Sequence, residues 1–420
     1  MNKISMFKVL FLYLLLVGTK SFGQVTLDRC QAMARENYPM IRQYDLIEQT
    51  REYSISNVNK AYLPRLDVSL IGGVISGLPS FSLPGESTSG TSDFNLITVV
   101  QVNQPLWDGG LTRARRKVTE AGSEIERANL EVSLYALEER INNLFFGTLL
   151  IDEQVRQMDI LRSNLERNRE RARIAVQNGT AYNSDVDEIQ VEVISVEQKT
   201  EELKSNRRAY LNMLEAMIGA KIDDSSQLVK PEASGELMAL ENHRPELGLF
   251  ESQENLVEAR SQMDRSMLYP RIGLLGFGTF LQPGVDFGTS TLDNVFVGGL
   301  SLNWSIDGIY TNANNRKLSE LGLEQVSVSR ETFLFNNSLE LTQNRLELEK
   351  YRKMMEQDRQ ILELKARIKE AYELKYENGV STMSELLDKT NEESVAQQNL
   401  IVHEIRYLMK AYEYRNKTGN

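Results

Sequence analysis

The sequence predicts a mainly helical protein with a β portion, built as a duplicated helix–strand–strand–long coiled-coil hairpin. Two long stretches, 106–230 and 305–420, contain no proline. In the first stretch, apolar residues recur at alternating steps of four and three over 130–158 and 186–217, which is the 3.5-residue period of coiled coils. Each stretch follows two segments in which apolar and polar residues alternate, the pattern of a half-exposed strand.

The first 23 residues have the pattern of an export signal. Lys3 and Lys8 form a basic end, residues 9–17 are mostly apolar, and residues 21–23 suit cleavage near Gly23. Cys30 is the only cysteine, and the charged residues before it do not fit a lipid-attachment motif, so we expect no lipid anchor. A net charge of −11 argues against a nucleic-acid partner.

The first structural repeat is predicted over residues 24–230. A helix is expected over Asp28–Ala61, interrupted near Tyr38-Pro39, followed by strands at about 66–76 and 94–104. A turn-rich loop separates the strands. A continuous helix over Leu111–Val176 would be about 100 Å long at 1.5 Å per residue, which no compact domain needs.

That helix is predicted to end in a hairpin tip at 177–185. Asn178-Gly179 favours the left-handed turn that ends a helix, and Ser184-Asp185 offers a serine cap with a carboxylate in the first turn of the next helix.

The second repeat, 231–420, gives the same order again. Pro270-Arg271 follows Pro64-Arg65 by 270 − 64 = 206 residues, and strands are expected at about 271–281 and 294–304. A second tip at 377–385 contains Asn378-Gly379, which follows Asn178-Gly179 by 378 − 178 = 200 residues. Matching order, prolines, strands and tips indicate an internal duplication.

The four strands have the length and alternation of membrane-spanning β-segments. Four strands cannot close a barrel, and lipid does not tolerate an open sheet edge, so strands in a membrane would require several copies of the chain. Aromatic residues near the strand ends would suit an interfacial girdle. The alternative, in which these aromatics pack in a soluble β-domain, stays open; the residues are Phe94, Trp107, Phe277, Phe280 and Trp304.

These features together resemble the TolC family of outer-membrane efflux proteins, over about residues 25–414. The resemblance rests on Tyr62-Leu63-Pro64-Arg65, Tyr269-Pro270-Arg271, the segment 104–110 (QPLWDGG) and the segment 379–388 (GVSTMSELLD), in this order. It implies a homotrimer with a twelve-stranded barrel in the Gram-negative outer membrane, continuous with a periplasmic α-helical barrel. Such a channel passes substrate from a periplasmic adaptor and an inner-membrane pump of the RND, ABC or MFS class, in efflux or type I secretion.

The resemblance also implies roles for residues at the tips. Asp185, Glu385 and Asp388 match the family's acidic periplasmic entrance. Gly179-Thr180 and Gly379-Val380 match the tips that touch the adaptor. The chain departs from the family at Asn178 and Asn378, which replace valine, and at Ser381, which replaces an arginine that locks the entrance of some members.

Other functions have less support in the sequence. Capping alone would explain Asp185 and Glu385 without an entrance role. His243 and His403 are the only histidines and lie 160 residues apart (403 − 243), so we expect no enzyme, no metal site and no cofactor. A periplasmic coiled-coil adaptor or scaffold without a transmembrane barrel is the alternative function.

Overall fold

The computed structural model describes residues 24–74, 94–223, 226–232, 241–283 and 293–420. The predicted signal peptide therefore lies outside the described residues. The chain forms two compact units, each drawn from both halves of the sequence. The hairpin unit contains Met1–Arg42, Glu131–Pro245 and Phe333–Asn420, and the sheet unit contains Gln43–Leu130 and Glu246–Thr332. The division into repeats at residue 230 does not follow these units and stays a prediction.

The helices agree closely with the predicted ones. The predicted break near Pro39 is confirmed, because a short 3₁₀ turn separates α2 from α3. The predicted continuous helix is also confirmed: α4 has 67 residues. The helices are α2 (Leu27–Asn37), α3 (Gln43–Asn59), α4 (Leu111–Gln177), α5 (Asn183–Ile218), α6 (Pro245–Ser266), α7 (Asp307–Glu377) and α8 (Met383–Thr418), with the 3₁₀ turns η1 (Pro39–Arg42) and η2 (Lys60–Tyr62).

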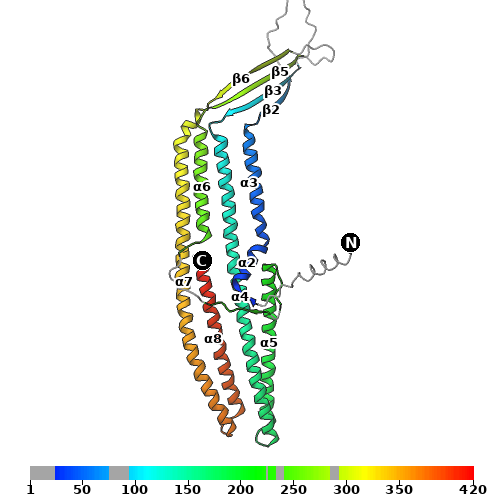
Figure 1. The fold of residues 1–420 in the computed structure, drawn as a ribbon, viewed down its shortest axis with the longest axis vertical. Coiled ribbons are helices and arrows are strands. Elements are labelled where there is room, and N and C mark those ends of the chain that lie inside the picture. The colour runs from blue at the N-terminus through cyan, green and yellow to red at the C-terminus, as the bar shows by residue number, and fades with distance from the viewer. Residues whose placement is uncertain (1–23, 75–93, 224–225, 233–240, 284–292) are drawn as a thin grey trace, which may run out of the picture. The chain divides into compact units, whose positions relative to one another are not determined.

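The sheet unit contains four antiparallel strands in the order β2-β3-β5-β6. Their bounds are β2 Arg65–Val74, β3 Phe94–Trp107, β5 Arg271–Pro283 and β6 Asp293–Asn303, within three residues of the predicted ends. Within this unit α3, α6 and the first turns of α4 and α7 all lie at the same end of the sheet, where strands begin or end (Figure 1).

The two faces of the sheet differ in polarity. The strand register places side chains of alternate residues on the same face. One face is apolar and exposed, with Leu66 63% exposed. Its members are Leu66, Val68, Leu70, Val100, Val102, Ile272, Leu274, Phe280, Phe296, Leu300 and Leu302. The other face carries most of the polar residues, among them Arg65, Asp67, Ser69, Gln101, Asn103, Arg271, Ser301 and Asn303.

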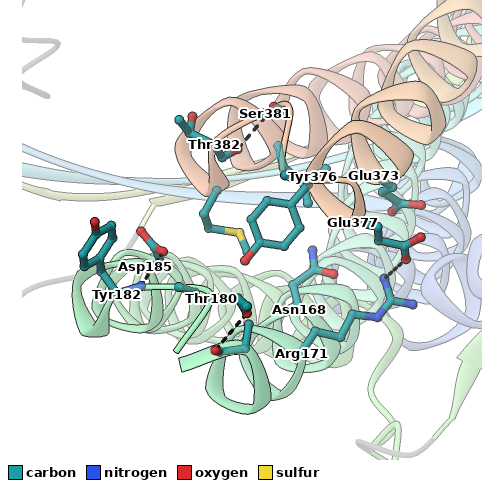
Figure 2. A pocket seen from close by; sticks show the side chains of 15 residues that line it. Asn168, Arg171, Thr180, Tyr182, Asp185, Glu373, Tyr376, Glu377, Ser381 and Thr382 are labelled. Atoms are coloured by element: carbon teal, nitrogen blue, oxygen red, sulfur yellow. Dashed lines mark hydrogen bonds and ion pairs between the residues drawn. The ribbon is translucent and has the colours of Figure 1, made fainter. Parts of the chain in front are cut away.

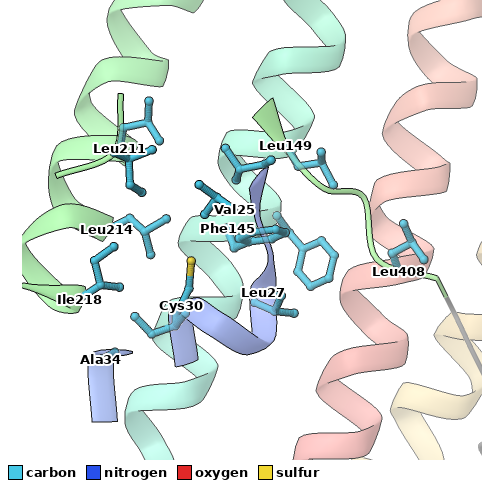
Figure 3. Close-up of a cluster of buried hydrophobic side chains, with 14 of the residues drawn as sticks. Val25, Leu27, Cys30, Ala34, Phe145, Leu149, Leu211, Leu214, Ile218 and Leu408 are labelled. Atoms are coloured by element: carbon cyan, nitrogen blue, oxygen red, sulfur yellow. The ribbon is translucent and has the colours of Figure 1, made fainter. Parts of the chain in front are cut away.

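The hairpin unit has an apolar core where α2 packs against α4 and α5 (Figure 3). Cys30 is 1% exposed there, and burial raises the pKa of its thiol to about 11. A parallel pair formed by β1 (Gln24–Val25) and β4 (Gln227–Leu228) ties the segment before α2 to the segment after α5. Strands of two residues have no readable period, so the sequence did not predict this pair.

The predicted 3.5-residue stripe of the first hairpin is buried, with Leu134, Ile141, Leu165, Ile189 and Leu214 at most 1% exposed. Most of this seam between α4 and α5 is aliphatic, and it continues towards the tip through Met158, Leu161, Val193 and Val196. The coiled-coil packing of the first hairpin therefore rests mainly on apolar burial.

The second hairpin has a different seam. In α7 the buried residues Asn337, Asn344, Tyr351 and Asp358 follow one another at steps of seven, so three of four heptad positions carry an amide or a carboxylate. Asp358 Oδ2 lies 2.5 Å from His403 Nδ1 of α8. The polar character of this seam was not predicted from the sequence.

Ion pairs extend the contact between α7 and α8 from that histidine towards the tip. Lys365 lies 2.5 Å from Glu392, and Lys369 lies 2.8 Å from Glu393. Hydrogen bonds from Lys365 and Lys389 lower the pKa of Glu392 to about 2. Charge pairing thus takes over part of the role that aliphatic packing has between α4 and α5.

We predict that Asn344→Leu stabilises the protein. Asn344 is 2% exposed, and neither its amide nitrogen nor its amide oxygen has a hydrogen-bond partner among the described residues. An unpaired buried polar group costs about 1–3 kcal/mol, which an apolar residue of similar volume avoids. The thermal midpoint of the purified protein should rise. Asn337→Leu, one heptad earlier, is the matched comparison. A thermal midpoint of Asn344→Leu below that of the unmodified protein would contradict the prediction.

Candidate functional site

The two predicted hairpin tips have the same backbone. Gly179 and Gly379 have φ angles of +72° and +71°, the left-handed conformation predicted for both. Thr180 N donates to Ala175 O at 2.9 Å, and Val380 N donates to Lys375 O at 2.8 Å. Both turns therefore have the 6→1 hydrogen bond of a Schellman motif, which satisfies a carbonyl at the end of the helix.

The helix after the second tip begins with a complete capping box. Thr382 Oγ1 accepts a hydrogen bond from Glu385 N at 3.2 Å, and Glu385 Oε2 accepts one from Thr382 N at 2.9 Å. Ser381 Oγ also donates to Glu385 Oε2, at 2.8 Å. These hydrogen bonds, first those from Thr382 N–H and then that from Ser381, lower the pKa of Glu385.

The predicted serine caps are wrong. The N-cap residues are Tyr182 and Thr382, and Ser184 and Ser384 already lie in the first turn of α5 and α8. In the first tip Asp185 Oδ2 accepts from Tyr182 N at 3.0 Å. The predicted first-turn carboxylates are therefore present, each bonded to the cap residue three positions earlier.

A cavity of about 730 Å³ lies between the two tips. The ring of Tyr376 points into this space from the end of α7, facing Asp185 and Thr180 of the first tip (Figure 2). Its hydroxyl is buried and has no hydrogen-bond partner among the described residues. Arg171 of α4 and Glu377 of α7 form an ion pair at 3.8 Å on one side of the cavity.

Burial raises the pKa of the Tyr376 hydroxyl, and the negative charge of Asp185 raises it further. Asp185 therefore lines the space between the tips together with Gly379 and Thr180. Glu385 and Asp388 are exposed on α8 and do not line that cavity. The sequence did not single out Tyr376, although it directly precedes the tip motif.

The predicted aromatic residues lie at different places on the sheet. Trp107 ends β3 and pairs with Ile272 of the apolar face, and the exposed Trp304 directly follows β6. Phe94 begins β3 at the opposite end, and Phe280 stacks edge-on against Phe296, with ring centroids 5.6 Å apart. Phe277 lies in the middle of β5 and shares the polar face with Gln101.

The described residues contain no cluster of three or more histidine, cysteine, aspartate or glutamate side chains that could hold a metal ion. His403 is engaged with Asp358, and the exposed His243 lies 3.8 Å from Glu241. Neither contact joins a nucleophile to a base. What the tips offer is a crevice and exposed side chains for contact with another molecule.

The sequence comparison reaches the first half of the chain. Residues 32–220 match the sequence profile of the family described as outer membrane efflux protein. No curated protein sequence matches the chain. Over residues 32–220 the chain is therefore similar to outer membrane efflux proteins.

The fold of this chain is similar to that of solved outer-membrane channels. VceC from Vibrio cholerae is 11% identical with a TM-score of 0.68, and the match covers 94% of this chain and 96% of VceC. CmeC from Campylobacter jejuni is 14% identical (TM-score 0.64, 94% and 85% covered), and MtrE from Neisseria gonorrhoeae is 16% identical (0.62, 94% and 89%). The predicted TolC-like fold class is confirmed.

The matching family and the similar solved structures are outer-membrane proteins and channels, not enzymes. The prediction that this protein is not an enzyme is therefore confirmed. No helix within the described ranges has an apolar stretch long enough to cross a membrane.

We predict that the cap of the second tip depends on pH through Glu385. Its folded-state pKa lies below the ordinary 4.5, so its stabilisation is present above pH 4.5 and is lost as the pH falls through the lower folded value. Glu385→Gln should speed amide hydrogen exchange in residues 379–388 near neutral pH, and the difference should vanish in acid. Asp388→Asn is the control, because the Asp388 side chain makes no hydrogen bond to the cap. Equal exchange of the Gln variant and the unmodified protein at neutral pH would contradict the prediction.

Proposed function

We propose that this protein is the trimeric outer-membrane channel of a tripartite efflux or type I secretion system. Substrate would pass from an inner-membrane pump of the RND, ABC or MFS class, through a periplasmic adaptor and this channel, to the exterior. The observation that carries the proposal is the sheet, which has one exposed apolar face and two unpaired edges. A periplasmic adaptor or scaffold without a transmembrane barrel would need to cover that face with other residues, and none of the described residues does so.

The dimensions of the apolar face suit a bilayer. From Asn294, which pairs with Phe280, to Trp304 is ten residues along β6. At 3.3 Å per residue and a tilt of about 40° these span about 25 Å, the height of the apolar band of outer-membrane barrels. Phe94 and Phe280 would then mark one interface, and Trp107 and Trp304 the other. Phe277, on the polar face, would lie outside this girdle.

The edges of the sheet support the trimer. β2 and β6 each pair on one side only. Three copies joined edge to edge would give twelve strands and leave no edge in lipid. The exposed face of α7 adds a second surface for a neighbouring copy. It carries apolar residues at coiled-coil spacing, Leu321 and Val328 in the sheet unit and Phe335, Leu339 and Leu346 in the hairpin unit.

The proposal also includes export and removal of residues 1–23 and an outer-membrane location without a lipid anchor. We predict that the mature protein, extracted in mild detergent, has the mass of three chains and forms ion-conducting pores in planar bilayers. A soluble monomer that needs no detergent would support the adaptor alternative. A monodisperse monomer in detergent with its strands intact would contradict the trimer.

We propose that Asp185, Glu385 and Asp388 surround the periplasmic mouth of the channel. Glu385 and Asp388 lie one turn apart on α8 and are both exposed. Their summed field would favour cations at the mouth. Glu385→Ala with Asp388→Ala should lower the cation-over-anion permeability ratio in planar bilayers. An unchanged ratio would leave only the capping role of Glu385 standing.

We propose that the tips, Gly179-Thr180 and Gly379-Val380, are where the adaptor docks. A β-carbon added at either glycine meets no atom within 4 Å, so the backbone there is open to a partner. Val380 is 75% exposed, an apolar side chain at the end of the hairpin unit with no cover among the described residues.

Gly379→Leu is predicted to abolish export while the trimer still assembles. Because leucine also strains the left-handed turn by about 1–2 kcal/mol, Gly379→Asn is the matched variant: asparagine tolerates that backbone and still adds bulk at the contact. Crosslinking to the adaptor and an export assay measure both. Normal export by Gly379→Asn would show that the tip glycines only form turns and would place docking elsewhere.

A further inference from the structure

The matching segments Pro64-Arg65 and Pro270-Arg271 place an arginine at the same point of each half. Arg65 is the first residue of β2, and Arg271 is the first residue of β5. Both therefore lie at the end of the sheet that meets the helices of the sheet unit (Figure 1). Proline can begin a strand but cannot donate within its ladder, so it fixes where each strand starts.

The register puts both arginines on the polar face. Arg65 pairs with Asn103 and Arg271 pairs with Asn303. The residue that follows each arginine, Leu66 or Ile272, points to the apolar face, because side chains alternate along a strand. If the apolar face meets lipid, both guanidinium groups face the lumen.

Both side chains are exposed, and neither makes an ion pair or a hydrogen bond with a described residue. The acidic residue nearest in sequence on the same face is Asp67, two positions after Arg65. Asp108, near the end of β3, is buried and accepts hydrogen bonds from Tyr62 and Thr112. Arg65, Arg271 and Asp67 together give the polar face a net charge of +1 per chain at this end of the sheet. The whole protein, in contrast, has a net charge of −11.

We propose, on the basis of the channel function above, that Arg65 and Arg271 form a ring of six guanidinium groups in the trimer lumen where the strands begin. Unpaired guanidinium groups bind carboxylates, phosphates and sulfonates in a two-pronged geometry. Rings of arginine or lysine select for anions in pores. The ring therefore favours cargo that carries an anionic group, in contrast to the acidic residues at the mouth.

The orientation can be tested by cysteine substitution, because the single native cysteine, Cys30, is 1% exposed. Arg65→Cys and Arg271→Cys are compared with Leu66→Cys and Ile272→Cys, their neighbours on the opposite face. A membrane-impermeant methanethiosulfonate should reduce the pore current of the two arginine variants and leave the other two unchanged. Block of the Leu66 and Ile272 variants instead would reverse the faces and overturn the inference.

The charge effect is measured as the reversal potential in a KCl gradient. Arg65→Gln combined with Arg271→Gln should lower the chloride-over-potassium permeability ratio by about twofold or more, most clearly at low salt, where screening is weakest. Asp67→Asn should raise the ratio, and Asn103→Ser, a neutral change beside Arg65, should leave it unchanged. If the variant trimers form pores with the ratio of the unmodified protein, the arginine ring is wrong although the channel stands. If the unmodified protein forms no pore, the channel function itself fails.

Discussion

The constraint on which the rest of this structure depends is the unpaired edge. Among the described residues, nothing pairs with the backbone N–H and C=O groups on the outer sides of strands β2 and β6. In lipid each such group costs several kcal/mol, and no side chain on the sheet can replace a neighbouring strand. The exposed apolar face favours contact with lipid, but the unpaired edges prevent a single chain from entering the membrane. Association of several copies pairs the edges and leaves the apolar face in lipid. The same association would cover the exposed apolar stripe of α7.

The two hairpins share a plan but not a core. Aliphatic side chains dominate the seam between α4 and α5, whereas the buried heptad positions of α7 hold Asn337, Asn344 and Asp358. Aliphatic seams gain free energy from burial and tolerate sliding, while a buried carboxylate needs its partner at one position. The pair of Asp358 with His403 therefore fixes the register of α8 on α7. Hairpins of similar length are thus held together by different kinds of contact, and a few side chains make the difference.

The sequence predicted the features that depend on local signals. Proline spacing and the 3.5-residue period gave α4 to within one residue, and strand alternation gave the four strands to within three. In the second tip the predicted cap was wrong because Thr382 and Ser384 are both good caps and only the backbone conformation decides which residue stands outside the helix. In the first tip the cap is Tyr182, which is not a preferred cap residue. Tyr376, the β1–β4 pair and the Asp358–His403 contact were missed because each joins segments distant in the chain, for which one sequence carries no signal.

The tips show how one backbone can present two surfaces. Every hydrogen bond that shapes the turn and cap is local, from Thr180 N to Ala175 O in one tip and from Glu385 to Thr382 in the other, so a dozen residues encode the shape and duplication copies it intact. The side chains that project from it are free to differ, because a β-carbon at either glycine meets nothing and the cap needs only one carboxylate. They do differ: Tyr182, 79% exposed, corresponds to Thr382, and Thr180 corresponds to Val380.

A partner that contacted all the tips of a trimer would therefore meet one turn geometry with two alternating surfaces, one aromatic and polar, the other aliphatic. Recognition of both requires a partner with two kinds of contact site or two copies of the partner for each chain.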